Sequence, residues 1–294
     1  MFPKDSARSM IGKDERLGLN TALAGKKYPV GTYEVTSEAI KKYAQATNED
    51  NPVFNSDQAL IPPAFPIVPA GAGIANAFFD QELGVNLPLL VHGEEDHVFH
   101  LPIRSGDVLT VESSLESVDQ KETGETFTVY TSLAIQGGEL ACELRSLMFI
   151  RGTGSGSRSG TSTEEPPEIA FQTIQKVDDD QTYRYAEASG DHNSIHVDPE
   201  FATKVAGLPG IICHGMCTMA FASKAVLDEA AGGDPSRLKR IKVRFSKPVF
   251  PGQTLTTRGW LLSDSKGLKT YGFETLNPEG QAVIKNGVAE VLMT

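Results

Sequence analysis

The spacing of apolar residues divides the second half of the chain into a helical part and a strand part. Residues 216–227 are apolar on nearly every face, and a helix of that kind is usually buried all round. From residue 240 the pattern alternates, with basic residues at 240, 242 and 244 and apolar residues at 241, 243 and 245. Further strand-like runs cover 254–262, 268–276 and 282–293, separated by turn-forming residues. This half therefore predicts a buried helix followed by an antiparallel meander.

Two shorter helical segments precede the buried helix. The first is predicted over 178–188 and ends at Gly190. The second begins at Asp198, which can cap it, with Pro199 as its first helical residue. A polar loop from Gly190 to His196 lies between them.

The chain also contains an internal repeat. Residues 43–54 align with 185–196 at a spacing of 142, Gly71 aligns with Gly215 at 144, and 99–106 aligns with 245–252 at 146. A Gly- and Ser-rich segment that closes with two prolines separates the copies and is typical of a flexible linker. We therefore predict a first half over 1–150, a linker over 151–168 and a second half over 169–294. Each half is expected to wrap a sheet around a helix.

The two copies differ where chemistry is expected. Glu49 stands opposite Asp191 and Phe54 stands opposite His196, whereas an asparagine occupies both 51 and 193. The first copy has lost its titratable imidazole. We interpret the second half as the catalytic copy and the first half as a structural and substrate-binding partner.

The loop carries a recognisable motif, Gly-Asp-x-Asn-Pro-aliphatic-His, in which Ser194 replaces the proline. With the segments 91–94, 212–215 and 241–252, it resembles the hydratase 2 group, the MaoC-like (R)-specific enoyl-CoA hydratases. The chain is similar to the hydratase 2 region of peroxisomal multifunctional enzymes. The resemblance implies an α+β double hot-dog fold. It also implies reversible hydration of trans-2-enoyl-CoA to (3R)-3-hydroxyacyl-CoA in fatty-acid metabolism, by a hydro-lyase.

This hydration needs a base, an acid and donors for the enolate oxygen. Asp191 and His196 lie five residues apart on one loop, so a turn can bring both side chains to one water. Asn193 is expected to hold the loop or the water. The N–H of Gly215, at the start of the buried helix, can meet the thioester oxygen. The sequence leaves open which residue moves which proton.

Substrate contacts are predicted in both halves. The resemblance implies ligand contacts from His92, Gly93, Lys121 and Phe245. A basic stripe can neutralise the phosphates of coenzyme A, or it is only a solvated strand face; it consists of Arg237, Lys239, Arg240, Lys242, Arg244 and Lys247. The remaining residues expected at the substrate site are His192, Ser194 and Ile195, although His192 also fits a solvent-facing position.

Composition excludes several other functions. A net charge of −11 argues against a general nucleic-acid or anionic-membrane binder. Three cysteines indicate a reducing compartment, and we find no apolar run suited to a signal peptide or a bilayer span. We expect a cytoplasmic protein, or a peroxisomal one in a eukaryote. A homodimer is possible. No cofactor is expected, because coenzyme A is part of the substrate.

Several alternatives stay open at this stage. Cys213, His214 and Cys217 lack a fourth ligand for zinc, so we predict no metal site, and His214 is expected to be structural. We predict no partner for His97 or His100. A dehydratase acting on acyl carrier protein would use the same residues. A hot-dog thioesterase or a non-catalytic acyl-CoA binder would share the fold.

Overall fold

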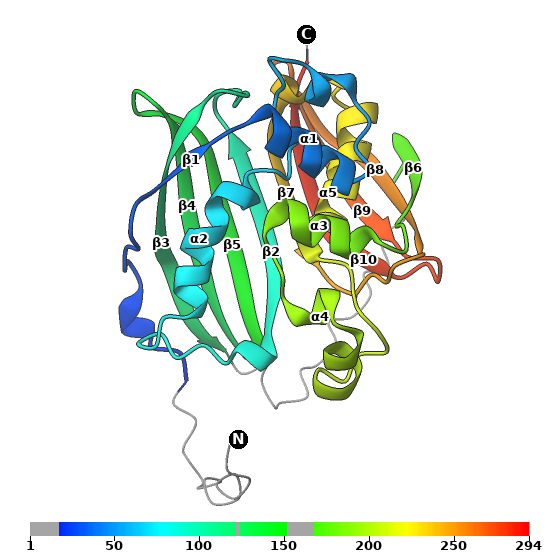
Figure 1. The fold of residues 1–294 in the computed structure, drawn as a ribbon. Helices are drawn as coiled ribbons and strands as arrows, with labels where there is room; N and C mark the ends of the chain where they lie inside the picture. Colours follow the sequence, from blue (N-terminus) through cyan, green and yellow to red (C-terminus); the bar gives the residue numbers. More distant parts are fainter. Residues whose placement is uncertain (1–17, 122–123, 152–166, 294) are drawn as a thin grey trace, which may run out of the picture.

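The computed structural model describes residues 18–121, 124–151 and 167–293, with the side chains of Lys121 and Arg151 left out (Figure 1). Within them, ten strands form one antiparallel sheet in the order β1-β3-β4-β5-β2-β7-β10-β9-β8-β6. The first half supplies β1 (Gly31–Glu34), α1 (Ser37–Ala46), α2 (Ile67–Phe78), β2 (Leu90–Phe99), β3 (Val108–Lys121), β4 (Gly124–Ile135) and β5 (Glu139–Arg151). The second supplies β6 (Phe171–Lys176), α3 (Gln181–Ser189), α4 (Ser194–Val197), α5 (Gly215–Glu229), β7 (Leu238–Phe245), β8 (Thr254–Ser265), β9 (Leu268–Leu276) and β10 (Ala282–Leu292).

The order of strands in the sheet reproduces the internal repeat of the sequence. Five strands of each half follow the same order outward from the centre, and β2 pairs with β7 in the middle. Tyr43 and Tyr185, which the alignment matches, meet between the halves. Their rings are 5.7 Å apart and their hydroxyl oxygens 3.5 Å apart. The two halves therefore form one continuous sheet with a local symmetry at its centre.

Each half packs a helix against its part of the sheet. Helix α2 lies across β3, β4 and β5, as Figure 1 shows. Helix α5 contacts β6, β7, β8 and β10, and eleven of its fifteen residues are buried. The predicted buried helix, the meander strands and the wrapped sheet are all present. The burial of α5 fits its apolar composition on every side, because both the sheet and the loops cover it.

The structure corrects one predicted helix start and shows that one aligned pair of glycines takes different helix positions. Helix α3 begins at Gln181, not at 178, because the Asp178 carboxylate is held outside the helix by Arg184 and Asn48. Helix α2 begins at Ile67, so Gly71 lies inside the helix and is not equivalent to the first residue of α5. Residues 152–166 of the predicted linker lie outside the described residues. No helix in the described part of the chain is long and apolar enough to cross a bilayer.

Candidate active site

The polar loop after α3 is held by its own side chains. Gly190 ends α3 with a φ of 79°, a left-handed conformation that suits glycine. The Asp191 carboxylate accepts a hydrogen bond from the Asn193 N–H at 3.1 Å. The Asn193 side chain then caps α4 by accepting from the Ile195 N–H at 3.3 Å. Asn193 therefore holds the loop, and α4 carries His196 into the interior.

One tautomer of His196 is fixed by a backbone carbonyl. Its Nδ1 lies 2.8 Å from the oxygen of Ile212, which can only accept, so Nδ1 carries the hydrogen. Nε2 then has a free lone pair. The side chain is buried, and burial lowers the pKa of His196 from its usual value, although the Asp191 carboxylate opposes this effect. The ring is thus kept neutral and able to accept a proton through Nε2.

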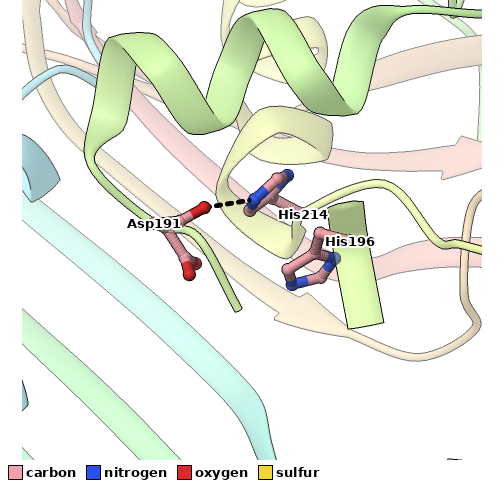
Figure 2. Close-up of side chains that lie close together, drawn as sticks. All are labelled: Asp191, His196 and His214. Atoms are coloured by element: carbon pink, nitrogen blue, oxygen red, sulfur yellow. Dashed lines mark hydrogen bonds between the residues drawn. The ribbon is translucent and has the colours of Figure 1, made fainter. Parts of the chain in front are cut away.

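His214 packs directly on His196. The ring centroids are 3.8 Å apart and the rings are stacked at 26°. The His214 Nε2–H donates to the backbone oxygen of Asp191 at 2.9 Å, the dashed line in Figure 2. Burial and the neighbouring His196 lower the pKa of His214 to about 4. His214 bonds backbone, as a structural histidine is expected to, and it joins the Asp191 loop to the start of α5.

Asp191, His196 and His214 form one compact cluster (Figure 2). One carboxylate oxygen and one nitrogen from each ring all lie within 4.8 Å of one another. A single water can reach two such atoms at ordinary hydrogen-bond distances. The set includes the residue types of a metal site, but one nitrogen of each ring already bonds a backbone carbonyl. The geometry suits a bound water better than a metal.

Gly215 opens α5 beside this cluster. Among the described residues, no oxygen accepts a hydrogen bond from its N–H, as is usual for the first residue of a helix. A methyl group added at Gly215 would lie 3.4 to 3.5 Å from the Phe245 ring. The Phe245 ring in turn lies 4.9 Å from the ring of His92 on β2. The fold therefore brings two predicted contacts, one from each half, to the predicted oxyanion donor.

The other predicted substrate residues are more scattered. Ser194 and Ile195 are half-buried on α4, whereas the His192 side chain is 57% exposed and lies 3.9 Å from Glu187. Gly93 sits at a β-bulge in β2. The Lys121 side chain lies outside the described residues.

Four of the six residues of the basic stripe are already engaged within the protein, two by carboxylates and two by backbone carbonyls. Arg240 pairs with Asp96 at 2.7 Å and Lys242 pairs with Glu94 at 3.1 Å, because β2 lies beside β7. Arg237 and Lys239 donate to backbone carbonyls. Only Arg244 and Lys247 remain available; Arg244 is 52% exposed and its nearest acidic partner, Glu94, is 3.9 Å away.

The first copy of the loop is used for a different contact. Glu49 is buried, and its carboxylate lies 3.4 Å from Lys224 of α5, which also contacts Asp50 at 2.6 Å. Asn51 donates to the Gly233 carbonyl at 2.7 Å. Phe54 is fully buried. This loop therefore connects the first half to the second half, and we name the contact between Glu49, Asp50 and Lys224 the loop clamp.

His97 and His100, for which the sequence predicted no partner, both bond carboxylates. His97 and His92 both bond the fully buried Glu95, and His100 bonds Glu143. The alignment at a spacing of 146 could have identified this polar set from the sequence. It matches His92, Glu95 and His97 with three apolar residues, Leu238, Ile241 and Val243. A polar set on one strand only is a candidate for a role in the single retained site.

Comparisons with known proteins agree on one family. Residues 159–280 match the model of the MaoC like domain, and residues 22–144 match that of the FAS1-like dehydratase domain region. The probable enoyl-CoA hydratase 2 of Dictyostelium discoideum is 31% identical, over 88% of each chain. The peroxisomal enoyl-CoA hydratase 2 of Arabidopsis thaliana is 34% identical, over 71% of this chain and 72% of its own. Mouse peroxisomal multifunctional enzyme type 2 is 32% identical over 78% of this chain, which covers only 32% of that protein.

Solved structures agree on the fold. A MaoC-like dehydratase from Phytophthora capsici superimposes with a TM-score of 0.78 at 27% identity, over 95% of this chain and 98% of its own. A Mycobacterium tuberculosis protein described as a double hot-dog superimposes with a TM-score of 0.60 at 9% identity, over 92% of this chain and 96% of its own. The expected double hot-dog fold is therefore confirmed.

Proposed function

Since this chain belongs to the MaoC-like family that includes the enoyl-CoA hydratase 2 enzymes, we propose that it adds water reversibly to trans-2-enoyl-CoA. The product is a 3-hydroxyacyl-CoA, with the (3R) configuration expected for this group, and the enzyme is a hydro-lyase. One observation carries the proposal. The Asp191 carboxylate and a neutral, tautomer-fixed His196 cluster with His214, and the next residue, Gly215, has an N–H that no described residue accepts.

The chemistry needs only these groups and one water. Nε2 of His196 takes a proton from the water while the water oxygen forms a bond to C3 of the substrate. The electron pair of the double bond moves towards the thioester oxygen, where the Gly215 N–H stabilises the developing enolate. The imidazolium then returns its proton to C2, so that one water is added and His196 is regenerated. Asp191 holds the water and stabilises the imidazolium through its charge.

The first test replaces His196. His196→Ala should abolish the loss of enoyl absorbance on addition of crotonyl-CoA, because it removes the Nε2 lone pair that takes the proton of the water. His100→Ala, whose ring pairs with Glu143 away from the cluster, is the matched histidine control and should keep its activity. Chiral analysis of the product tests the (3R) configuration. Unchanged turnover in His196→Ala would remove His196 from the mechanism.

Two further assays separate the related activities. A thiol-trapping reagent detects free CoA, and release of CoA without 3-hydroxyacyl-CoA would indicate a thioesterase. Crotonyl thioesters of CoA and of acyl carrier protein compare the two carriers. One relative is named 3-hydroxyacyl-thioester dehydratase Y, which is the reverse reaction. Arg244 and Lys247 are the cations of the stripe left for the phosphates of CoA.

Location and assembly are secondary parts of the proposal. Relatives named peroxisomal support a peroxisomal location if the source is eukaryotic. A homodimer of the two-half chain is tested by light scattering of the purified protein.

A further inference from the structure

A charged carboxylate lies at the centre of the sheet with no contact to solvent. The Glu95 side chain on β2 is 0% exposed. Its two oxygens lie 2.8 Å from Nε2 of His92 and 2.8 Å from Nε2 of His97. A buried carboxylate is costly unless it is paired and hydrogen-bonded. Nothing in the hydration chemistry above uses it, so its retention needs another explanation.

Hydrogen-bond partners define the protonation of this cluster, which we name the Glu95 bridge (His92, Glu95 and His97). Burial alone would raise the pKa of Glu95, but hydrogen bonds and charge from the two histidines lower it to about 2, so it is ionised and only accepts. His97 Nδ1 lies 3.1 Å from the Pro63 carbonyl, which also only accepts. Both ring nitrogens of His97 therefore face groups that only accept, so each is placed to donate a hydrogen bond. His92 donates its Nε2–H to the other carboxylate oxygen.

A β-bulge brings His92 to the bridge. In a regular strand, residues 92 and 95 would point to opposite faces. Residues 93 and 94 both oppose Leu147 of β5, which shifts the alternation by one residue and places His92, Glu95 and His97 on the inner face. A side chain at Gly93 would come within 3.2 Å of the Leu147 carbonyl oxygen and 2.9 Å of its methyl carbon. Glycine at 93 therefore allows the bulge.

The second half has the same geometry without the same chemistry. Strand β7 has its own bulge at the matching residue, 239, between the pairs formed by Arg240 and Leu238 with β10. Leu238, Ile241 and Val243 are all buried, in the positions of His92, Glu95 and His97. The polar set is therefore not required by the fold. It is present only on the strand whose His92 packs on Phe245, the ring next to Gly215.

The bridge reaches the active site through two aromatic contacts. The His92 ring lies 4.9 Å from the Phe245 ring, and that ring borders the space next to Gly215. We propose that Glu95, with His97, is a positioning residue that fixes the His92 ring, and through it the Phe245 wall, against the thioester end of the substrate at Gly215. The proposal rests on the proposed hydratase function. Without the bridge, His92 is free to leave Phe245, and the thioester oxygen is held less well against the Gly215 N–H.

Two variants distinguish the hydrogen bond from the charge. In Glu95→Gln the amide oxygen can accept from His92 and the amide NH₂ can donate to a neutral His97, so the geometry is kept and the charge is lost. Glu95→Leu/His97→Leu gives β2 the apolar character that β7 has at the matching positions, so it removes the bridge without leaving a buried charge; the Pro63 carbonyl and the His92 Nε2–H each lose one hydrogen bond. This double variant is expected to fold.

The experiment measures kcat and KM for crotonyl-CoA with the wild-type enzyme and both variants, with thermal unfolding as the check on folding. We expect kcat of Glu95→Leu/His97→Leu to fall about 10- to 100-fold with a smaller change in KM, since loss of alignment by about 1 Å costs on that order. Glu95→Gln should stay within about threefold. Adding His92→Phe to the double variant should cause little further loss.

The outcomes separate this proposal from the proposed function. If the wild-type enzyme hydrates crotonyl-CoA and the double variant keeps its kcat within about threefold, the positioning role is refuted. A loss in Glu95→Gln equal to that in the double variant would also overturn it, because charge and not geometry would then matter. If the wild-type enzyme does not hydrate any enoyl thioester, the proposed function fails. A crystal structure of the double variant then decides the positioning: an unmoved His92 ring refutes it and a displaced ring supports it.

Discussion

The loop clamp gives a quantitative prediction about how the halves are joined. Replacing Lys224 by Met keeps most of the packing volume and removes the only cation that contacts the Glu49 carboxylate among the described residues. The Glu49 side chain is 4% exposed and that of Lys224 is 15% exposed, so the pair is largely shielded from solvent. Removing one partner of a buried pair costs about 3–5 kcal/mol.

Protonation reduces this loss in a predictable way. Burial raises the pKa of Glu49, while the N–H of Asn51 and the Lys224 charge oppose the effect. In Lys224→Met the folded protein can bind a proton at Glu49 more readily than the unfolded chain can. We therefore expect Lys224→Met to cost about 3 kcal/mol at pH 8 and distinctly less at pH 5. The contacts of Lys224 with the exposed Asp50 and half-exposed Asp228 add no more than about 1 kcal/mol.

Urea unfolding followed by circular dichroism tests this prediction through a double-mutant cycle. Glu49→Gln should cost about 1 kcal/mol, and Glu49→Gln/Lys224→Met should cost about 2 kcal/mol in total, which gives a coupling of about 2 kcal/mol. Lys204→Met is the control, because Lys204 is 71% exposed and pairs only with the exposed Glu200 among the described residues. A coupling below about 0.5 kcal/mol, or a cost that does not shrink at pH 5, would refute the clamp.

Three further predictions concern the site. Gly215→Ala should fold normally, because its methyl group meets Phe245 at ordinary contact distance, yet turnover should fall about tenfold or more as the methyl crowds the thioester oxygen; steady-state kinetics and thermal unfolding measure both effects. Between pH 6.5 and about 4, unfolded His214 binds a proton that the folded protein does not, so stability should decrease as pH falls, by up to about 1.4 kcal/mol per pH unit; His214→Gln should weaken this dependence in urea titrations. Arg244→Gln/Lys247→Gln should raise KM for crotonyl-CoA more than for crotonyl-pantetheine and leave kcat nearly unchanged; equal effects on both substrates would exclude a phosphate contact.

Sequence patterns predicted the features that depend on local spacing. The buried helix, the meander strands and the loop that ends at His196 all follow from residues close together in the chain. The catalytic roles of Asp191, His196 and Gly215 stay predictions; the structure brings Asp191 and His196 together with His214, the residue before Gly215.

Features set by strand pairing were harder to predict. The basic stripe on β7 was interpreted without its neighbour, although Glu94 and Asp96 on β2 alternate in the same way. Only the pairing of β2 with β7 shows that these charges neutralise each other. The Glu95 bridge likewise depends on a bulge at Gly93 and on the Pro63 carbonyl, 34 residues from His97. Neither the register of a bulge nor a distant carbonyl can be derived from alternation along one strand.

The pairing of β2 with β7 also limits how a substrate can enter. Residues 94–98 and 240–244 are joined by backbone pairing across the centre of the sheet, and ion pairs reinforce the same line. Many enzymes with a site between two units admit substrate by a hinge motion that separates them. Here such a hinge would break the backbone pairing between β2 and β7, so the two halves must stay joined while the enzyme turns over substrate.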